Sequence, residues 1–245
     1  MIAGILTGRK GSKGFPGKNL FPVLGKPLSY YPMIAALKCR DIDKVYLSTD
    51  DELLMKLAED HGALVIKRPS ELCSDGALSE GVFIHAYNVV KSENGGIEPE
   101  FLVLLMCNAA TVTSEKISEG INVLRANPYY DSAVTVSKYN MWSPSRARKI
   151  GKDGLLHPFV PPETFGDPKT LNCDRDSQGD VFFADMGVSI VRPKCLENIK
   201  KGQLPQKWMG KKIYPLEQWG GLDVDFEWQI PQVEYWLKKH GFKDD

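Results

Sequence analysis

Short apolar stretches alternate with longer amphipathic stretches through the first half of the chain. The apolar stretches predict strands, because near-continuous runs of four to eight apolar residues are typical of strands buried on both faces of a sheet. They lie at residues 2–7, 44–49, 63–68, 101–108 and 131–139. The amphipathic stretches between them predict helices at residues 27–39, 51–62, 78–91 and 113–127. This alternation indicates a mostly parallel sheet that is covered by helices.

The pattern changes between residues 141 and 180. This stretch is rich in Pro, Gly, Asp and Arg and has no sustained period, so we interpret it as an inserted arm with loops. Strand-like sequence returns at 181–193 and 211–217, and residues 225–241 predict a closing helix. We therefore expect residues 1–245 to form a single doubly wound α/β domain with an irregular insert at about 141–180.

Composition and charge exclude several classes of function. The 31 Lys and Arg residues balance 31 Asp and Glu residues, whereas nucleic-acid-binding domains usually carry a strongly basic surface. No apolar run approaches the ~20 residues that span a bilayer, and the apolar opening is too short for a signal peptide. The five cysteines, an odd number without CxxC spacing, fit a reducing compartment. We expect a cytoplasmic protein with neither nucleic-acid nor membrane partners.

The first predicted strand is followed by the loop GRKGSKGFPGKN at residues 8–19. It holds four glycines and four cations, which are Arg9, Lys10, Lys13 and Lys18. Ligands of open α/β sheets lie beyond the carboxyl ends of the strands, and this loop leaves the first strand at that edge. Glycines let backbone N–H groups approach a ligand, and cations match phosphate oxygens. A solvated turn would explain one lysine, but the whole string favours a phosphate site, although it fits neither the Walker A nor the GxGxxG pattern.

This loop resembles the N-terminal signature of the nucleotidyltransferases that make CMP-activated acidic sugars. The CMP-sialic acid synthetases (acylneuraminate cytidylyltransferases) are nearest in pattern, and the Kdo cytidylyltransferases are further off. The matching positions are Arg9, Gly11, Ser12, Lys13, Gly14, Pro16, Lys18 and Asn19. Further matches are STDDEL (48–53), KRPSELCSDGA (67–77), DRDSQG (174–179) and GGLDVDFEWQI (220–230). The resemblance implies a Rossmann-like nucleotidyltransferase fold and the transfer of CMP from CTP to an acidic sugar, with release of pyrophosphate.

The resemblance also implies roles for the matched residues. Arg9 and Lys18 are the catalytic candidates, because positioning and electrostatic stabilisation dominate such transfers. The positions implied to contact CTP are Gly11, Ser12, Lys13, Asn19, Arg68 and Ala77, of which Arg68 and Ala77 would line the cytosine pocket. The positions implied to contact the acceptor are Asn108, Arg175 and Gln178.

Two carboxylates near the C-terminus are candidate metal ligands. Asp223 and Asp225 are two residues apart, so in an extended chain they lie on one face and can share an ion. Mg²⁺ is satisfied by one or two carboxylates together with phosphate oxygens. Alternatively, Asp225 caps the helix predicted to follow it. From the resemblance we expect Mg²⁺ as the cofactor and a homodimer whose inserted arms reach toward the partner's site.

The sequence departs from the family where the acceptor would bind. The family usually reads QxTSP at a position where this chain has Met106, Cys107, Asn108, Ala109 and Ala110. Gln229 replaces a carboxylate after the acidic pair, and the family's Asn-Gly before the late strand becomes Asp185-Met186-Gly187. The acceptor is therefore open between an acidic sugar and another anion, such as a phosphonate or a sugar phosphate. A nucleotide-binding protein without turnover is a further alternative.

Overall fold

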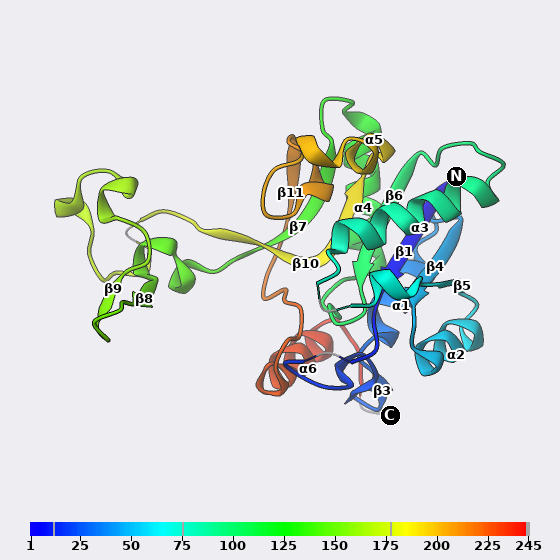
Figure 1. The fold of residues 1–245 in the computed structure, drawn as a ribbon, viewed down its shortest axis with the longest axis horizontal. Coiled ribbons are helices and arrows are strands. Elements are labelled where there is room, and N and C mark those ends of the chain that lie inside the picture. The colour runs from blue at the N-terminus through cyan, green and yellow to red at the C-terminus, as the bar shows by residue number, and fades with distance from the viewer. Residues whose placement is uncertain (12, 75, 177, 244–245) are drawn as a thin grey trace.

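The central element of the fold is a seven-stranded sheet with the order β11-β7-β10-β6-β1-β4-β5 (Figure 1). The computed structural model describes residues 1–243 apart from 12, 75 and 177, so Ser12 lies outside the described residues. The strands are β1 (Ile2–Thr7), β4 (Lys44–Thr49), β5 (Leu64–Lys67), β6 (Phe101–Met106), β7 (Ser132–Lys138), β10 (Phe182–Val191) and β11 (Ile213–Gln218). Only β10 runs antiparallel to its neighbours in this sheet, which confirms the expected mostly parallel sheet.

Helices cover both faces of this sheet, as the alternating sequence pattern predicts. The helices α1 (Tyr30–Lys38), α2 (Glu52–Asp60) and α4 (Ser114–Ala126) pack on one face. The helices α3 (Ser79–Glu93) and α5 (Pro193–Glu197) pack on the other. The last helix, α6 (Ile230–Lys239), packs against the segment around Phe15–Tyr31 and forms a third apolar cluster with it. No helix of the described chain is long and apolar enough to cross a membrane.

Two predicted helices start later than the sequence pattern indicates. The first begins at Tyr30, because the preceding residues form the small hairpin of β2 (Pro22–Val23) and β3 (Lys26–Pro27). The last begins at Ile230, after a short 3₁₀ turn at Glu227–Gln229. The Oε1 atom of Gln229 accepts the backbone N–H groups of Asp225 and Phe226, at 2.7 and 2.8 Å. Asp225 is therefore not the cap of α6, and the capping alternative is wrong.

The segment between β7 and β10 forms an arm that stands away from the rest of the protein (Figure 1). The arm is more regular than its sequence indicates, because β8 (Arg148–Ile150) and β9 (Leu156–Pro158) pair as a hairpin. At its base, Lys138 lies opposite Phe182, and the N–H of Tyr139 donates to the carbonyl of Val181 at 2.9 Å. The arm thus leaves and rejoins the sheet at one place.

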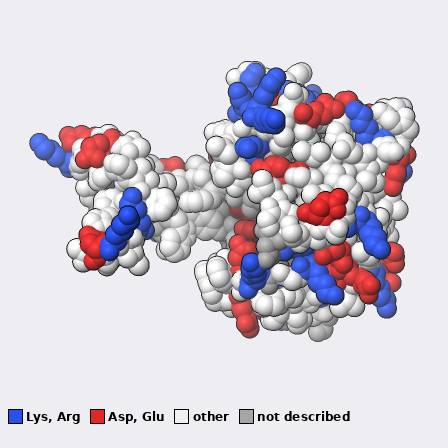
Figure 2. Space-filling model, in the orientation of Figure 1, with Lys and Arg blue, Asp and Glu red and all other residues white. Residues whose placement is uncertain are grey.

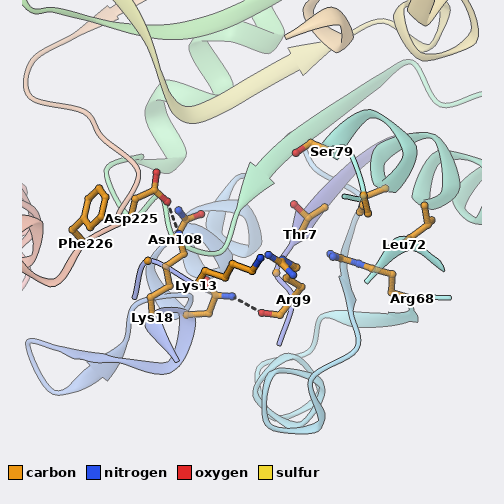
Figure 3. A pocket seen from close by; sticks show the side chains of 15 residues that line it. Thr7, Arg9, Lys13, Lys18, Arg68, Leu72, Ser79, Asn108, Asp225 and Phe226 are labelled. Carbon is orange, nitrogen blue, oxygen red and sulfur yellow. Dashed lines mark hydrogen bonds and ion pairs between the residues drawn. The ribbon is translucent and has the colours of Figure 1, made fainter. Parts of the chain in front are cut away.

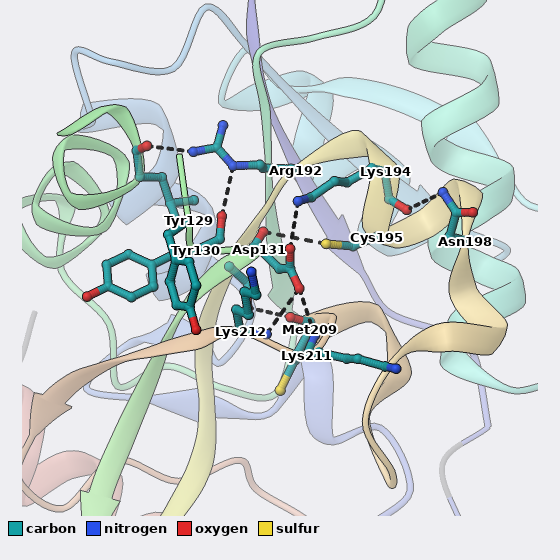
Figure 4. A network of polar contacts seen from close by, with 12 residues as sticks. Tyr129, Tyr130, Asp131, Arg192, Lys194, Cys195, Asn198, Met209, Lys211 and Lys212 are labelled. Atoms are coloured by element: carbon teal, nitrogen blue, oxygen red, sulfur yellow. Dashed lines mark hydrogen bonds and ion pairs between the residues drawn. The ribbon is translucent and has the colours of Figure 1, made fainter. Parts of the chain in front are cut away.

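A polar network ties three elements together at the amino-terminal end of β7 (Figure 4). The carboxylate of Asp131 accepts the backbone N–H groups of Lys211 and Lys212, both at 3.0 Å, and forms an ion pair with Lys194 at 2.7 Å. Basic side chains (Lys and Arg) gather over this region in Figure 2, near α5 and β11. The network fixes the start of β11 and of α5 against β7, at the opposite end of the sheet from the glycine-rich loop.

Candidate active site

A cavity of about 450 Å³ lies at the carboxyl ends of β1 and β6 (Figure 3). Its walls come from the glycine-rich loop, the segment after β5, the start of α3 and the segment before α6. The residues that line it are Thr7, Gly8, Arg9, Lys13, Gly14, Lys18, Asn19, Arg68, Leu72, Ala77, Ser79, Val82, Asn108, Asp225 and Phe226. This is the edge where ligands of open α/β sheets bind.

Side-chain and backbone contacts hold the glycine-rich loop in place. The N–H of Lys10 donates to the carboxylate of Asp50 at 2.9 Å, and the guanidinium of Arg9 donates to the carbonyl of Cys73 at 3.4 Å. Asn19 is 8% exposed and donates to the carbonyl of Arg9 at 3.3 Å. The loop is therefore tied to the segments that follow β4 and β5, and its cations are presented from a fixed backbone.

Two glycines of the loop are required by packing. A Cβ atom on Gly8 would lie 2.7 Å from the sulfur of Cys107, and one on Gly14 would lie 2.9 Å from the carbonyl oxygen of Asp225. Both distances are shorter than non-bonded contacts allow, so a side chain at either position would displace the loop. The glycines therefore let the loop lie against β6 on one side and the acidic pair on the other.

Lys18 and the acidic pair meet at one end of the cavity. The ammonium of Lys18 lies 2.6 Å from the carboxylate of Asp225, and the Lys18 side chain is 13% exposed. Asp223 is half-buried beside Asn108; burial and the neighbouring Asp225 carboxylate raise its pKa. A cation close to the two carboxylates would offset the cost of placing them side by side.

These oxygen donors fit a divalent cation. Among the described residues no group of three or more His, Cys, Asp or Glu side chains is placed to hold a metal. Two carboxylates are enough for Mg²⁺, which completes its coordination with water and phosphate oxygens. Asp225 lines the cavity, whereas Asp223 lies beside it and does not line it.

Arg68 closes the other end of the cavity. Its side chain is almost fully buried, and its guanidinium donates to the carbonyl of Ser48 at 2.7 Å and to the Ser48 hydroxyl at 3.4 Å. Burial lowers the pKa of Arg68. Leu72, Ala77 and Val82 form an apolar wall nearby, so this end suits a planar, mostly neutral group.

The cavity brings together most of the residues that the sequence predicts, but not all of them. Arg9, Lys13, Lys18, Asn19, Arg68, Ala77, Asn108 and Asp225 line it. Gly11 lines a small hollow on the other side of the loop. Arg175 lies on the arm in a separate hollow and pairs with Asp176 at 3.1 Å, and Gln178 follows it on the arm. The two arm residues therefore lie outside the cavity of their own chain.

Six residues that line the cavity were not predicted as site residues from the sequence. They are Thr7, Gly8, Leu72, Ser79, Val82 and Phe226. Ser79 and Val82 belong to the first turn of α3, and Phe226 follows the acidic pair directly. Each of them lies within a few residues of a predicted contact, and this proximity in the sequence could have identified them as candidates.

Comparison with known proteins gives the family. A family model described as cytidylyltransferase matches residues 3–142. The chain belongs to the cytidylyltransferase family. It is 32% identical over 139 residues to the N-acylneuraminate cytidylyltransferase of Escherichia coli, a match that covers 57% of this chain and 32% of the relative. It is 37% identical over 233 residues to that of Oncorhynchus mykiss, covering 94% and 49%, so the chain spans about a third to a half of these relatives.

Another relative matches over a larger share of its own length. The CMP-N,N'-diacetyllegionaminic acid synthase of Legionella pneumophila is 29% identical over 189 residues, which is 75% of this chain and 77% of the relative. Solved structures confirm the nucleotidyltransferase fold. A CMP:2-keto-3-deoxy-manno-octonic acid synthetase complexed with CTP superposes with a TM-score of 0.66 at 14% identity, covering 98% of this chain and 99% of that one.

Proposed function

We propose that this protein transfers CMP from CTP to an acidic sugar of the nonulosonic (sialic acid-like) class, releasing pyrophosphate. The observation that carries the proposal is the convergence of three loop cations and the buried Arg68 on one cavity, with a carboxylate pair at its edge. The negative charge of a triphosphate is complementary to the positive charge of these side chains. The relatives in the comparisons are named for CMP transfer to acylneuraminic, pseudaminic and legionaminic acids.

In this proposal the loop cations bind and orient the phosphates. Lys18 and Arg9 would contact the α-phosphate and the departing pyrophosphate, and stabilise the charge that develops there. Lys13 and Asn19 would contact the remaining phosphate oxygens or the ribose, and the backbone around Gly11 would donate N–H groups. The apolar wall near Arg68 and Ala77 would receive the cytosine.

Asp223 and Asp225 would hold one Mg²⁺. When bound, the ion neutralises phosphate charge and so makes the pyrophosphate a better leaving group. Lys18 lies against Asp225, so ion and lysine would act on the same phosphates. The donor set supports this proposal.

We further propose a homodimer in which the arm supplies acceptor contacts to the partner's site. Arg175 and Gln178 lie outside the cavity of their own chain, and the arm exposes large apolar side chains, among them Trp142, Leu156 and Phe159. A partner surface would cover these apolar groups. Arginine pairs with carboxylates in a bidentate geometry, so Arg175 suits an acidic acceptor.

The test is pyrophosphate release with CTP, Mg²⁺ and a panel of acceptors that includes sialic, pseudaminic and legionaminic acids, Kdo, a sugar phosphate and a phosphonate. Turnover with one nonulosonic acid, and with CTP over UTP, is the expected result. Turnover only with a phosphonate or a sugar phosphate would contradict the proposed acceptor but support the proposed CTP-dependent transfer. CTP binding by calorimetry without any turnover would leave a nucleotide-binding protein, and no CTP binding would reject the proposal.

A further inference from the structure

A buried polar cluster lies outside the cavity and is not used by the function proposed above. Its centre is Asp185, whose side chain is only 4% exposed. Asp185 lies on β10 where a bulge interrupts the pairing with β7, between Ala184 and Ser189. Met186, the next residue, has a φ of +62°, which a non-glycine residue rarely adopts.

Three neutral groups from different segments donate to the Asp185 carboxylate. The Ser137 hydroxyl on β7 donates at 2.6 Å, the Gln218 amide at the end of β11 at 2.9 Å, and the N–H of Gly187 at 3.1 Å. Within the described chain no Lys or Arg forms an ion pair with it. Because an unsatisfied buried carboxyl group is costly, the Asp185 side chain favours the arrangement in which all three donors stay in place.

Ser137 connects this cluster to the segment that carries the acidic pair, residues 219–225, which we call the acidic segment. The oxygen of the Ser137 hydroxyl accepts the N–H of Gly221 at 2.9 Å. The Tyr139 hydroxyl donates to the carbonyl of Gly221 at 2.8 Å. A Cβ atom on Gly221 would collide with the Asp185 carboxylate, so the backbone of the acidic segment lies directly against it.

The acidic segment is held again at the next residues. The hydroxyl of Thr111 accepts the N–H of Leu222 at 3.0 Å, and the carbonyl of Asn108 accepts the N–H of Val224 at 2.9 Å. Gln218, which donates to Asp185, also donates to the carbonyl of Thr111 at 3.0 Å. Asp185 is therefore bonded to Ser137, which holds the acidic segment at Gly221, and to Gln218, which holds Thr111, the residue that in turn binds Leu222.

We infer that Asp185 is a positioning residue for the acidic pair, acting through Ser137 and Gln218. The contacts at positions 221, 222 and 224 fix the backbone on both sides of Asp223 and directly before Asp225. Asp223 is thus held between two of these contacts, and Asp225 lies between the contact at Val224 and its own N–H bond to Gln229, so the two carboxylates are presented at a set spacing. The inference rests on the proposed function only for what the acidic pair binds; the ordering of the acidic segment does not depend on it.

The experiment compares Ser137→Ala and Asp185→Asn with the matched control Ser132→Ala. Ser132 is on the same strand, equally buried, and donates to the carbonyl of Met209, far from the acidic segment. Amide hydrogen exchange of residues 219–225 is measured on the ligand-free full chain. We expect exchange at Gly221 and Leu222 to rise about tenfold in both test variants, the effect of one lost hydrogen bond, and to match wild type in the control.

A second readout is Mn²⁺ binding in the presence of CTP, followed by electron paramagnetic resonance. Weaker Mn²⁺ binding in the test variants, with CTP binding little changed, supports the inference. Wild-type exchange at 219–225 in a folded Ser137→Ala or Asp185→Asn protein would overturn it. If wild type fails to bind CTP, the proposed function fails while the exchange result still decides the positioning role.

Discussion

Lys18 is a cation that already contacts an anion, and this determines what its removal should do. In Lys18→Ala we expect turnover to fall about a hundredfold or more, because one group that stabilises developing charge is lost. The thermal midpoint should change little, since the paired Asp225 carboxylate is mostly exposed and such pairs contribute little to stability. Steady-state kinetics and a melting curve measure both effects.

The control for this variant is Lys56→Ala, which removes an exposed lysine of α2 that does not line the cavity. It should turn over CTP at the wild-type rate. Wild-type turnover in Lys18→Ala would show that the loop cation has no role in the transfer.

Asp131 should make stability depend on pH. Burial alone would raise its pKa, but hydrogen bonds from Lys194 and the backbone of Lys211 and Lys212 together lower it. A carboxylate with a lowered folded-state pKa stabilises the protein above its unfolded pKa, and this contribution is lost as the pH falls through the folded pKa. Asp131→Asn should therefore cost about 1–3 kcal/mol at pH 7.

Urea denaturation across pH tests this expectation. The difference between wild type and Asp131→Asn should shrink below about pH 4, the ordinary pKa of an aspartate, as the pH falls toward the lowered pKa of Asp131 in the folded state. The exposed Asp60→Asn variant should stay within about 0.5 kcal/mol of wild type at pH 7. A constant difference between wild type and Asp131→Asn down to acid unfolding would show that ionisation of Asp131 does not stabilise the fold.

At the scale of elements, α4 depends on its cap. The Thr113 hydroxyl accepts the N–H of Lys116 at 3.2 Å, in the position where helices favour Ser, Thr, Asp or Asn. Thr113→Ala should lower the free energy of unfolding by about 1 kcal/mol, whereas Thr113→Ser should lose much less. Equal losses in the two variants, measured by urea denaturation, would mean that the methyl group matters and the cap does not.

The elements were predictable from the sequence where one local rule dominated. The strand β1 was predicted with its bounds, because five apolar or small residues in a row are typical of a buried strand, and all five are buried. The start of α6 was not, because Gln229 satisfies the backbone of Asp225 and Phe226 with a side chain, a contact that no periodicity reveals. The hairpin in the arm was missed because β8 and β9 are short and exposed, and so lack an alternating apolar face.

The residues of the site were predictable where a motif marks them, but the contacts between distant segments were not. Lys18 and Asp225 are 207 residues apart, and only the motif resemblance linked them before the fold placed them 2.6 Å apart. The role of Asn108 in holding the acidic segment could not be predicted, since its partner Val224 is a backbone carbonyl with no sequence signature. The packing that requires glycine at positions 8 and 14 could not be predicted either, because the atoms that a Cβ would meet belong to Cys107 and Asp225, which are distant in the sequence.

For the whole molecule, the proposed homodimer predicts complementation. A protein of 27.4 kDa should elute with about twice that mass by light scattering. If the arm serves the partner's site, Lys18→Ala and Arg175→Ala chains mixed by refolding should form some dimers with one intact site. The mixture should then recover up to about a quarter of wild-type turnover, by random pairing of chains.

Each variant alone should be nearly inactive, and mixing without refolding should restore nothing if the dimers do not exchange. Full activity of Arg175→Ala alone would exclude the arm from acceptor binding. A monomer at micromolar concentration would exclude the shared site.

The arm begins after β7 and ends before β10, and these two strands are paired where the arm joins them, with Lys138 opposite Phe182. A tight turn could join these two strands without touching the buried core. The arm is thus joined to the rest of the protein at one paired position of the sheet. If the arm contacts the acceptor as proposed, a chimera that exchanges the arm at these two positions should keep its requirement for CTP and take the acceptor preference of the protein that donates the arm.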